Sequence, residues 1–357
     1  MKNFRLYDIL VRHQIYIEGY KNFNILKFRK ELPQLAKNIK DQFAKLEYQN
    51  LDLMTKKELT VFINNVKLVN QKFFDLHNND FLNELEKFTE KDFDINKALV
   101  VNFIAEDDGR ITDKKEIDHI FQNEAKKEND NKIFPFTWVF DNKDLKIYNA
   151  IKNSVIPAVG LTVAGYIASL GINSVKRIEQ TINAGIANKQ SASEILTSII
   201  GTKDNNYKDG IFVSIDRANA AINNTVIQHT TSVLEASIQS IIYDKYQWIS
   251  VIDNRTSDIC RYRNLRIFYY GKGPLPPAHP HCRSKIKPVV MGQVTPEESF
   301  YQWINRQPET VQKDILSKKR FKGLKDGTLQ AADFPTYQET IPLNLENFAS
   351  KLDIILT

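Results

Sequence analysis

The sequence predicts an α+β protein that is predominantly helical, with a small antiparallel sheet in its C-terminal half. Apolar residues recur at helical spacing over long stretches. Glycine is rare in the first 130 residues, where only Gly19 and Gly109 occur. Short β-branched and aromatic runs flank a stretch rich in proline, cysteine and histidine at 252–290. We expect a helical docking region at 1–130 and a second domain at 131–350, with 252–290 as its core and 291–357 as a helical tail.

Length and composition fit a soluble protein of two or three domains. The chain has 357 residues, of which 42% are hydrophobic and 26% are charged. Two cysteines argue against a disulfide scaffold. The first 13 residues are charged throughout and contain no apolar signal core, so we expect the cytoplasm of the cell that makes the protein.

The N-terminal region predicts several amphipathic helices. Apolar spacing marks one helix near residues 6–17 and another over Glu31–Leu46, with Pro33 in its first turn. Thr55 and Glu58 form a capping-box pattern that starts a third. Such helices are typical of a docking arm for partner subunits or of a plain helical domain, and the sequence leaves both open.

Residues 153–175 carry no charged side chain. The segment is long enough to span a bilayer, which needs ~20 apolar residues. Pro157, Gly160, Gly165 and Gly171 interrupt it. We therefore favour a buried helix with small-residue contacts, and keep a membrane-active segment as the alternative.

The remaining elements follow from local patterns. Residues 133–148 are rich in aromatic and β-branched side chains and predict a strand or a packed irregular segment. A helix–turn–helix follows at 176–200, and a long helix at 216–246. Short β-type runs at 248–252, 267–270 and 286–290 predict a small antiparallel sheet.

Cysteine and histidine gather in 252–290. Cys260, His279, His281 and Cys282 are ligand types that Zn²⁺ accepts. Pro280 sets an extended backbone, so the adjacent His281 and Cys282 should point to opposite faces. The four candidate ligands should therefore not all reach one ion. We therefore predict no metal and no cofactor, with packed cysteines. Zinc held by Cys260, His279 and Cys282 stays as the alternative.

Catalysis by this stretch receives little support. Cys282 beside His281 has the residue types of an activated thiol, but no acid lies nearby in sequence to orient the histidine. A histidine–metal nuclease would need a carboxylate such as Asp253 or Asp258. We predict no catalytic residues.

The same stretch carries the whole basic excess of the protein. It holds eight basic and two acidic residues, whereas the other 41 basic and 41 acidic residues cancel. Interleaved aromatic side chains fit a sequence-independent DNA contact, and a solvated basic face or a contact with an acidic protein is the alternative. The candidate DNA-binding residues are Arg255, Arg261, Arg263, Arg266, Lys272, Arg283, Lys285 and Lys287.

Two motifs in this stretch carry a family resemblance. Asp253-x-Arg-Thr-Ser-x-x-Cys260, followed by Pro276-Pro-Ala-His-Pro-His-Cys-Arg283, resembles the signature of the phage Mu F-like minor head proteins, the phage head morphogenesis domain. The resemblance covers roughly residues 150–350. Many members carry two further cysteines, whereas here arginines follow Cys260 and Ser284 stands at the last position. The motif residues are Asp253, Thr256, Cys260, Pro276, Pro277, His279, Pro280, Cys282 and Arg283.

The resemblance implies a minor capsid protein, present in several copies inside the virion near the portal after synthesis in the host cytoplasm. Its implied roles are head assembly, DNA packaging or DNA ejection. Its implied partners are the portal protein, the major capsid or scaffold protein, and double-stranded DNA bound non-specifically. No glycine-rich nucleotide loop or arranged catalytic glutamate occurs, so we expect no enzyme. The alternative is an effector enzyme delivered with the genome, either a nuclease or an ADP-ribosyltransferase-like protein.

Overall fold

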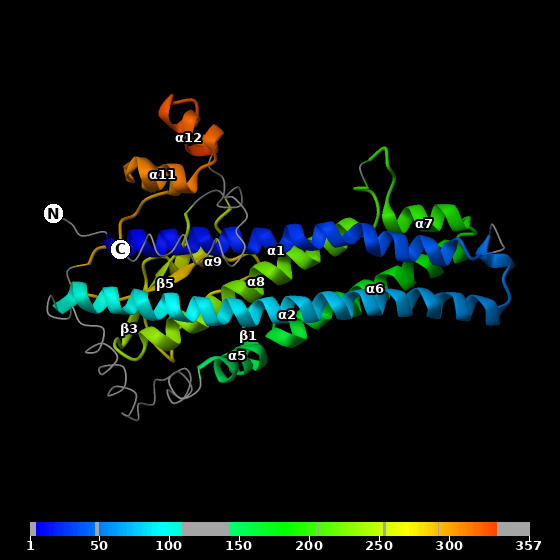
Figure 1. The fold of residues 1–357 in the computed structure, drawn as a ribbon, viewed down its shortest axis with the longest axis horizontal. Helices are drawn as coiled ribbons and strands as arrows, with labels where there is room; N and C mark the ends of the chain where they lie inside the picture. Colours follow the sequence, from blue (N-terminus) through cyan, green and yellow to red (C-terminus); the bar gives the residue numbers. More distant parts are fainter. Residues whose placement is uncertain are drawn as a thin grey trace. The chain divides into compact units, whose positions relative to one another are not determined.

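The computed structural model describes residues 5–46, 50–108, 143–205, 207–252, 255–291 and 293–333. The predicted fold class is confirmed, because α-helices make up most of these residues and a small antiparallel sheet accompanies them (Figure 1). Asp253 and the segment after residue 333 lie outside the described residues.

The chain forms long helices first and short elements later. The helices are α1 (Arg5–Phe43), α2 (Lys56–Asp108), α5 (Lys143–Asn153), α6 (Val163–Ala187), α7 (Ala192–Ile200), α8 (Phe212–Gln239), α9 (Asp258–Arg263), α10 (Phe300–Arg306), α11 (Glu309–Ile315) and α12 (Lys318–Lys325). The strands are β1 (Val155–Ile156), β2 (Leu161–Thr162), β3 (Lys245–Ile249), β4 (Ile267–Tyr269) and β5 (Lys285–Pro288). Short 3₁₀ helices are η1 (Leu51–Leu53) and η2 (Ala331–Asp333).

These elements group into two compact units, each made of several chain segments. Unit 1 comprises Met1–Phe23, Leu85–Gly160 and Asn224–Thr357, and unit 2 comprises Asn24–Glu84 and Leu161–Asn223. Helices α1, α2 and α8 therefore each contribute one part to unit 1 and another to unit 2.

Unit 2 is a helical bundle held by aromatic contacts. The Phe28 ring of α1 lies 4.6 Å from the His77 ring of α2, measured between centroids. Phe43 and Phe62 join the same two helices edge to face at 5.1 Å. Such ring pairs add to the burial of apolar area that stabilises helix packing. At the start of α7, Ser191 and Glu194 form a capping box.

Several local predictions were wrong. The long helix expected over 216–246 is α8, which ends at Gln239, and Lys245 and Tyr246 belong to β3. The structure contains one continuous helix, α1, where two were expected, and Pro33 lies inside it. Phe28 and Leu35 on either side of Pro33 are fully buried, and their packing outweighs the loss of one backbone hydrogen bond. Residues 143–148, expected as a strand or irregular segment, lie in α5, and 133–142 fall outside the described residues.

The predicted antiparallel sheet is confirmed in unit 1, with β3 between the edge strands β4 and β5. Trp248 of β3 lies opposite Ile286 of β5, and Tyr246 lies opposite Phe268 of β4. Ala236 of α8 packs against the sheet residues Tyr246 and Ile286. The strands begin and end a few residues from the predicted positions, as is usual for short elements.

The uncharged segment 153–175, expected as a buried helix, is helical only in its second half. It runs from the last residue of α5 through the paired strands β1 and β2 into α6. Thr162 caps α6 by accepting a hydrogen bond from the Gly165 amide. Among the described helices, none is both long and apolar enough to cross a membrane.

Candidate functional site

The site begins with a tight turn at His279-Pro-His-Cys282 in unit 1. The Cys282 amide donates to the His279 carbonyl oxygen at 3.1 Å, which closes a β-turn. Pro280 occupies its second position, and His281 its third with φ +62°. This pattern is that of a type II turn, and it brings the first and last residues close together.

The turn corrects the geometric expectation for this segment. An extended backbone through Pro280 and His281 was expected to separate the histidines from Cys282. Instead the left-handed conformation of His281 reverses the chain, so that His279 and Cys282 converge while the His281 side chain is exposed. The preceding Pro276 and Pro277 are buried, with a cis bond between them.

Helix α9 supplies the third member of the cluster. Ser257 caps this short helix by accepting from the Cys260 amide, and Cys260 itself is buried. The Cys260 Sγ lies 3.3 Å from His279 Nε2 and 3.7 Å from Cys282 Sγ. Both cysteines are free thiols packed against Trp248. We call Cys260, His279 and Cys282 the Cys/His cluster.

A hydrogen bond fixes the tautomer of His279. His279 Nδ1 lies 2.7 Å from the Pro280 carbonyl oxygen, which can only accept, so Nδ1 carries the proton. The lone pair of a neutral imidazole then lies on Nε2, which faces Cys260.

The pKa values of the two thiols shift in opposite directions. The hydrogen bond from the Cys282 thiol stabilises a Cys260 thiolate, which lowers the pKa of Cys260 to about 6. The same hydrogen bond, together with burial, raises the pKa of Cys282 well above its usual value. Cys260 is therefore the more acidic thiol of the pair.

Buried polar residues tie the cluster to the sheet. Trp248 Nε1 donates to Ser250 Oγ at 2.9 Å, and that hydroxyl donates to the Cys260 carbonyl oxygen at 2.8 Å. Ser250 Oγ also lies 3.2 Å from Ser284 Oγ, just before β5. Thr256 Oγ1 donates to the Val251 carbonyl oxygen at 2.5 Å. These hydrogen bonds thus connect β3, α9 and the residue before β5.

A small hollow opens beside the Cys/His cluster. Its volume is about 20 Å³, enough for one water molecule. Residues from the loop before α9, from α9 itself and from the turn before β5 line it: Val251, Arg255, Thr256, Ser257, Cys260, His279, His281, Arg283 and Ser284.

The structure separates the eight candidate DNA-binding residues into different environments. Lys285 and Lys287 are each 3% exposed, so neither offers its ammonium group to a phosphate in this structure. Arg263 and Arg283 are half-buried, and the Arg263 guanidinium lies over the Trp248 ring at 5.0 Å. The exposed ones are Arg255, Arg261, Arg266 and Lys272.

These four exposed residues follow one continuous run of short elements. Arg261 Nε donates to the Thr256 carbonyl oxygen, beside Arg255. The Arg266 guanidinium lies 3.5 Å from the centroid of Tyr262, which is 66% exposed. A turn joins Lys272 to the exposed Tyr269 at the end of β4. We call Arg255, Arg261, Tyr262, Arg266, Tyr269 and Lys272 the basic–aromatic surface.

Lys285 instead belongs to a buried charge network in unit 1. Its Nζ forms an ion pair with Glu235 of α8 and donates to His13 Nδ1 at 2.9 Å. His13 Nε2 donates to Asp92 Oδ1 at 2.8 Å. Burial, followed by the Lys285 charge, lowers the pKa of His13 to about 4. Burial raises the pKa of Glu235 to about 7, although Lys285 opposes this.

A second set of buried polar groups continues this network along α1. Lys21 Nζ donates to Glu18 Oε1 and to Gln228 Oε1, both at 2.6 Å. Gln228 Nε2 in turn donates to the Ser284 carbonyl oxygen at 2.9 Å. These hydrogen bonds join α1 and α8 to Ser284, the residue before β5.

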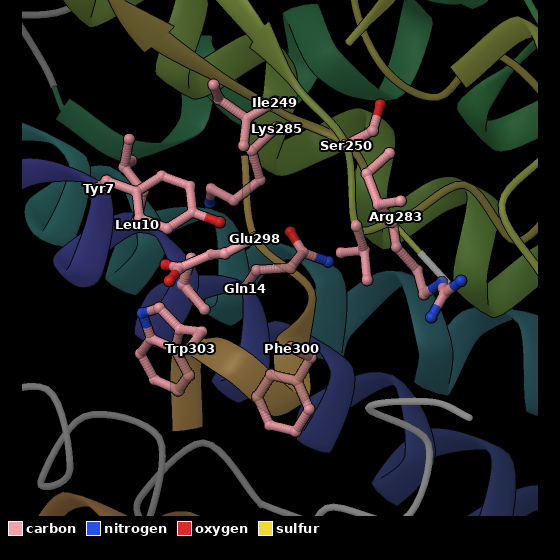
Figure 2. Close-up of a pocket in the computed structure, with 13 residues that line it drawn as sticks. Tyr7, Leu10, Gln14, Ile249, Ser250, Arg283, Lys285, Glu298, Phe300 and Trp303 are labelled. Atoms are coloured by element: carbon pink, nitrogen blue, oxygen red, sulfur yellow. The ribbon is translucent and has the colours of Figure 1, made fainter. Parts of the chain in front are cut away.

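Figure 2 shows a further cavity, where Lys285 and Arg283 extend to different sides among residues of α1, β3 and α10. Its volume is about 30 Å³, room for one or two water molecules. Tyr7 and Trp303 line it and belong to the same apolar cluster. This cavity therefore fits a packing gap in the core better than a substrate site.

Sequence reasoning missed the charge network, although one signal was present. Glu235 stands among Val233, Leu234 and Ile238 on the apolar side of a long helix. An acid in that position needs a buried partner.

Comparison of the chain with protein-family models, with curated proteins and with solved structures found no match.

Proposed function

We propose that the chain is a minor head protein of a tailed phage. In this proposal it lies inside the capsid near the portal, assists head assembly, DNA packaging or delivery, and contacts double-stranded DNA without sequence preference. The resemblance of the Cys/His/Pro motif to Mu F-like proteins supports the first part. The basic–aromatic surface supports the DNA contact and is the observation that carries it.

The composition of that surface suits the proposed partner. Four exposed cations can neutralise phosphates, and their release of counterions makes binding strong at low salt and weak at high salt. Tyr262 and Tyr269 expose rings beside Arg266 and Lys272. Such rings can contact sugars or unstacked bases without reading sequence.

The burial of the motif favours a structural role over a catalytic one. Cys260 is 3% exposed and Cys282 is fully buried, whereas a catalytic thiol must reach its substrate. The same residues link α9 to β5, so replacing them should cost stability. Under the rival enzyme proposal, a Cys260→Ser protein would stay folded and lose activity. Under ours it loses stability or fails to enter particles.

Quantitative mass spectrometry on purified particles, before and after genome release, tests the proposal. We expect a few to a few tens of copies per particle. Loss of the chain on release would place it among the ejected proteins, still within the proposal. Complete absence from particles would contradict the proposal, and it would equally contradict an effector enzyme that is delivered with the genome.

A further inference from the structure

We propose that Cys260, His279 and Cys282 bind one Zn²⁺ ion, with a water molecule as the fourth ligand. This inference rests on the geometry of the Cys/His cluster and does not depend on the proposed function. The sequence alone weighed against it, because His281 and Cys282 cannot face one ion together. The structure removes that objection, since His281 is not needed.

The three ligand atoms gather closely enough for one zinc ion to bridge them. With Zn–S bonds of about 2.3 Å and a Zn–N bond of about 2.0 Å, a tetrahedron has S···S edges of about 3.8 Å and S···N edges of about 3.5 Å. The observed Cys260–Cys282 and Cys260–His279 separations are 3.7 and 3.3 Å. All three ligand atoms lie within 4.8 Å of one another. Two of the three separations, both measured from Cys260 Sγ, therefore match the edges of a tetrahedral site.

The histidine is already oriented as a ligand. Zinc-binding histidines usually donate the second ring N–H to a carboxylate or a backbone carbonyl, which fixes the ring and the tautomer. His279 does this through Nδ1 and the Pro280 carbonyl oxygen at 2.7 Å. Its Nε2 therefore presents a lone pair toward Cys260.

The surroundings provide room for one further ligand. The hollow of about 20 Å³ is lined by both Cys260 and His279, so a water molecule there can reach the same ion. Ser257 and Ser284 also line the hollow and can hydrogen-bond that water. Three protein ligands plus water is the arrangement of zinc sites with an open position.

Zinc would also suit the charges and the packing. Two thiolates balance the charge of one Zn²⁺ ion. Trp248 and Phe268 shield the cluster on its apolar side. The ion would join α9 to the turn before β5. In the sequence, β4 and the proline-rich loop separate these two segments.

Metal analysis of the full chain tests the inference. The protein is purified under reducing conditions, incubated with Zn²⁺ and then desalted. We expect one zinc per chain, and loss of that zinc in Cys260→Ser and in His279→Asn. The matched control is His281→Asn, which alters the neighbouring exposed histidine and should keep the metal. Substituted Co²⁺ should show thiolate charge-transfer bands and the intense visible bands of a tetrahedral ion.

A gain-of-binding variant covers the case in which the loss variants fail to fold. Ser284→Cys adds a thiol to the hollow and should slow the removal of zinc by a chelator. Three results would each overturn the inference: a wild-type protein that keeps no zinc after incubation, an equal loss of zinc in His281→Asn, or faster zinc loss in Ser284→Cys. A Cys260–Cys282 disulfide under reducing conditions would overturn it as well.

Discussion

Two sets of basic residues from one short stretch of sequence have opposite environments. Lys285 and Lys287 on β5 are buried, and Lys285 pairs with Glu235 and His13. Arg261 and Arg266 lie at the surface around α9 and β4. For Lys285 the fold supplies an acid and an acceptor that compensate the lost hydration of its ammonium group. For Lys287 burial instead lowers the pKa to about 8, which weakens its charge.

The contrast shows that a local charge excess does not by itself define a binding surface. All eight basic residues contribute equally to the net charge of the stretch. Lys285 and Lys287 are buried, and Arg263 and Arg283 are half-buried. The proposed DNA contact therefore depends on four residues, and the interior lysines should affect stability instead.

The largest expected effect follows from breaking the buried ion pair. Lys285→Met should lower the free energy of unfolding by about 3–5 kcal/mol, because it leaves Glu235 buried without its cation. Urea denaturation measures the change. The double variant Lys285→Met/Glu235→Leu should recover most of it, since both charges are then absent.

The control is Lys318→Met on α12, an exposed lysine, which should change stability by less than about 0.5 kcal/mol. Equal losses for the Lys285 and Lys318 variants would show that burial does not distinguish the two.

The pH dependence of the free energy of unfolding should report the ionisation of Glu235 and His13 in the buried network. The raised pKa of Glu235, about 7 against 4.5 when unfolded, contributes stability that is lost as pH rises through that range. The lowered pKa of His13, about 4 against 6.5, contributes stability that is lost as pH falls through a similar range. These opposing contributions should partly cancel between pH 4.5 and 6.5.

Glu235→Gln removes one of the two contributions. Its stability should therefore rise more steeply with pH than that of the wild type between pH 4.5 and 6.5, as measured by urea titrations at several pH values. The exposed Glu297→Gln serves as the control and should follow the wild-type slope. A slope for Glu235→Gln that is no steeper than that of the wild type would argue against the network as described.

The smallest expected effect concerns the turn at His281. Its φ of +62° costs a non-glycine residue about 1 kcal/mol, so His281→Gly should stabilise the protein by up to about that amount. His281→Ala keeps the unfavourable conformation and should show no such gain. Equal thermal shifts for the two variants would contradict the assigned turn.

The sequence predicted the features that arise from local patterns. Short runs of β-branched and aromatic residues that include Trp248 and Ile286 predicted the antiparallel sheet. Thr55 with Glu58 predicted the start of α2, where both capping hydrogen bonds occur. Such signals need only a few neighbouring residues.

Features that depend on distant residues were not predictable in this way. The burial of Lys285 depends on His13, which is 272 positions away in the sequence. The convergence of Cys260 with His279 depends on the left-handed backbone of His281, a conformation that only a few per cent of non-glycine residues adopt. Sequence analysis therefore identified the members of the Cys/His cluster but did not predict their geometry.

The most direct test of the central claim is the salt dependence of DNA binding by two charge-matched variants. One replaces Arg255, Arg261, Arg266 and Lys272 with glutamine, and the other replaces the exposed α12 residues Lys318, Lys319, Lys322 and Lys325. Fluorescence anisotropy with a double-stranded fragment gives the slope of log affinity against log salt. If each surface residue contacts one phosphate, the first variant should lower the magnitude of that slope by about 3 to 4, and the α12 variant should leave it close to wild type. Equal effects of the two variants, or a wild-type chain that does not bind DNA, would contradict the account.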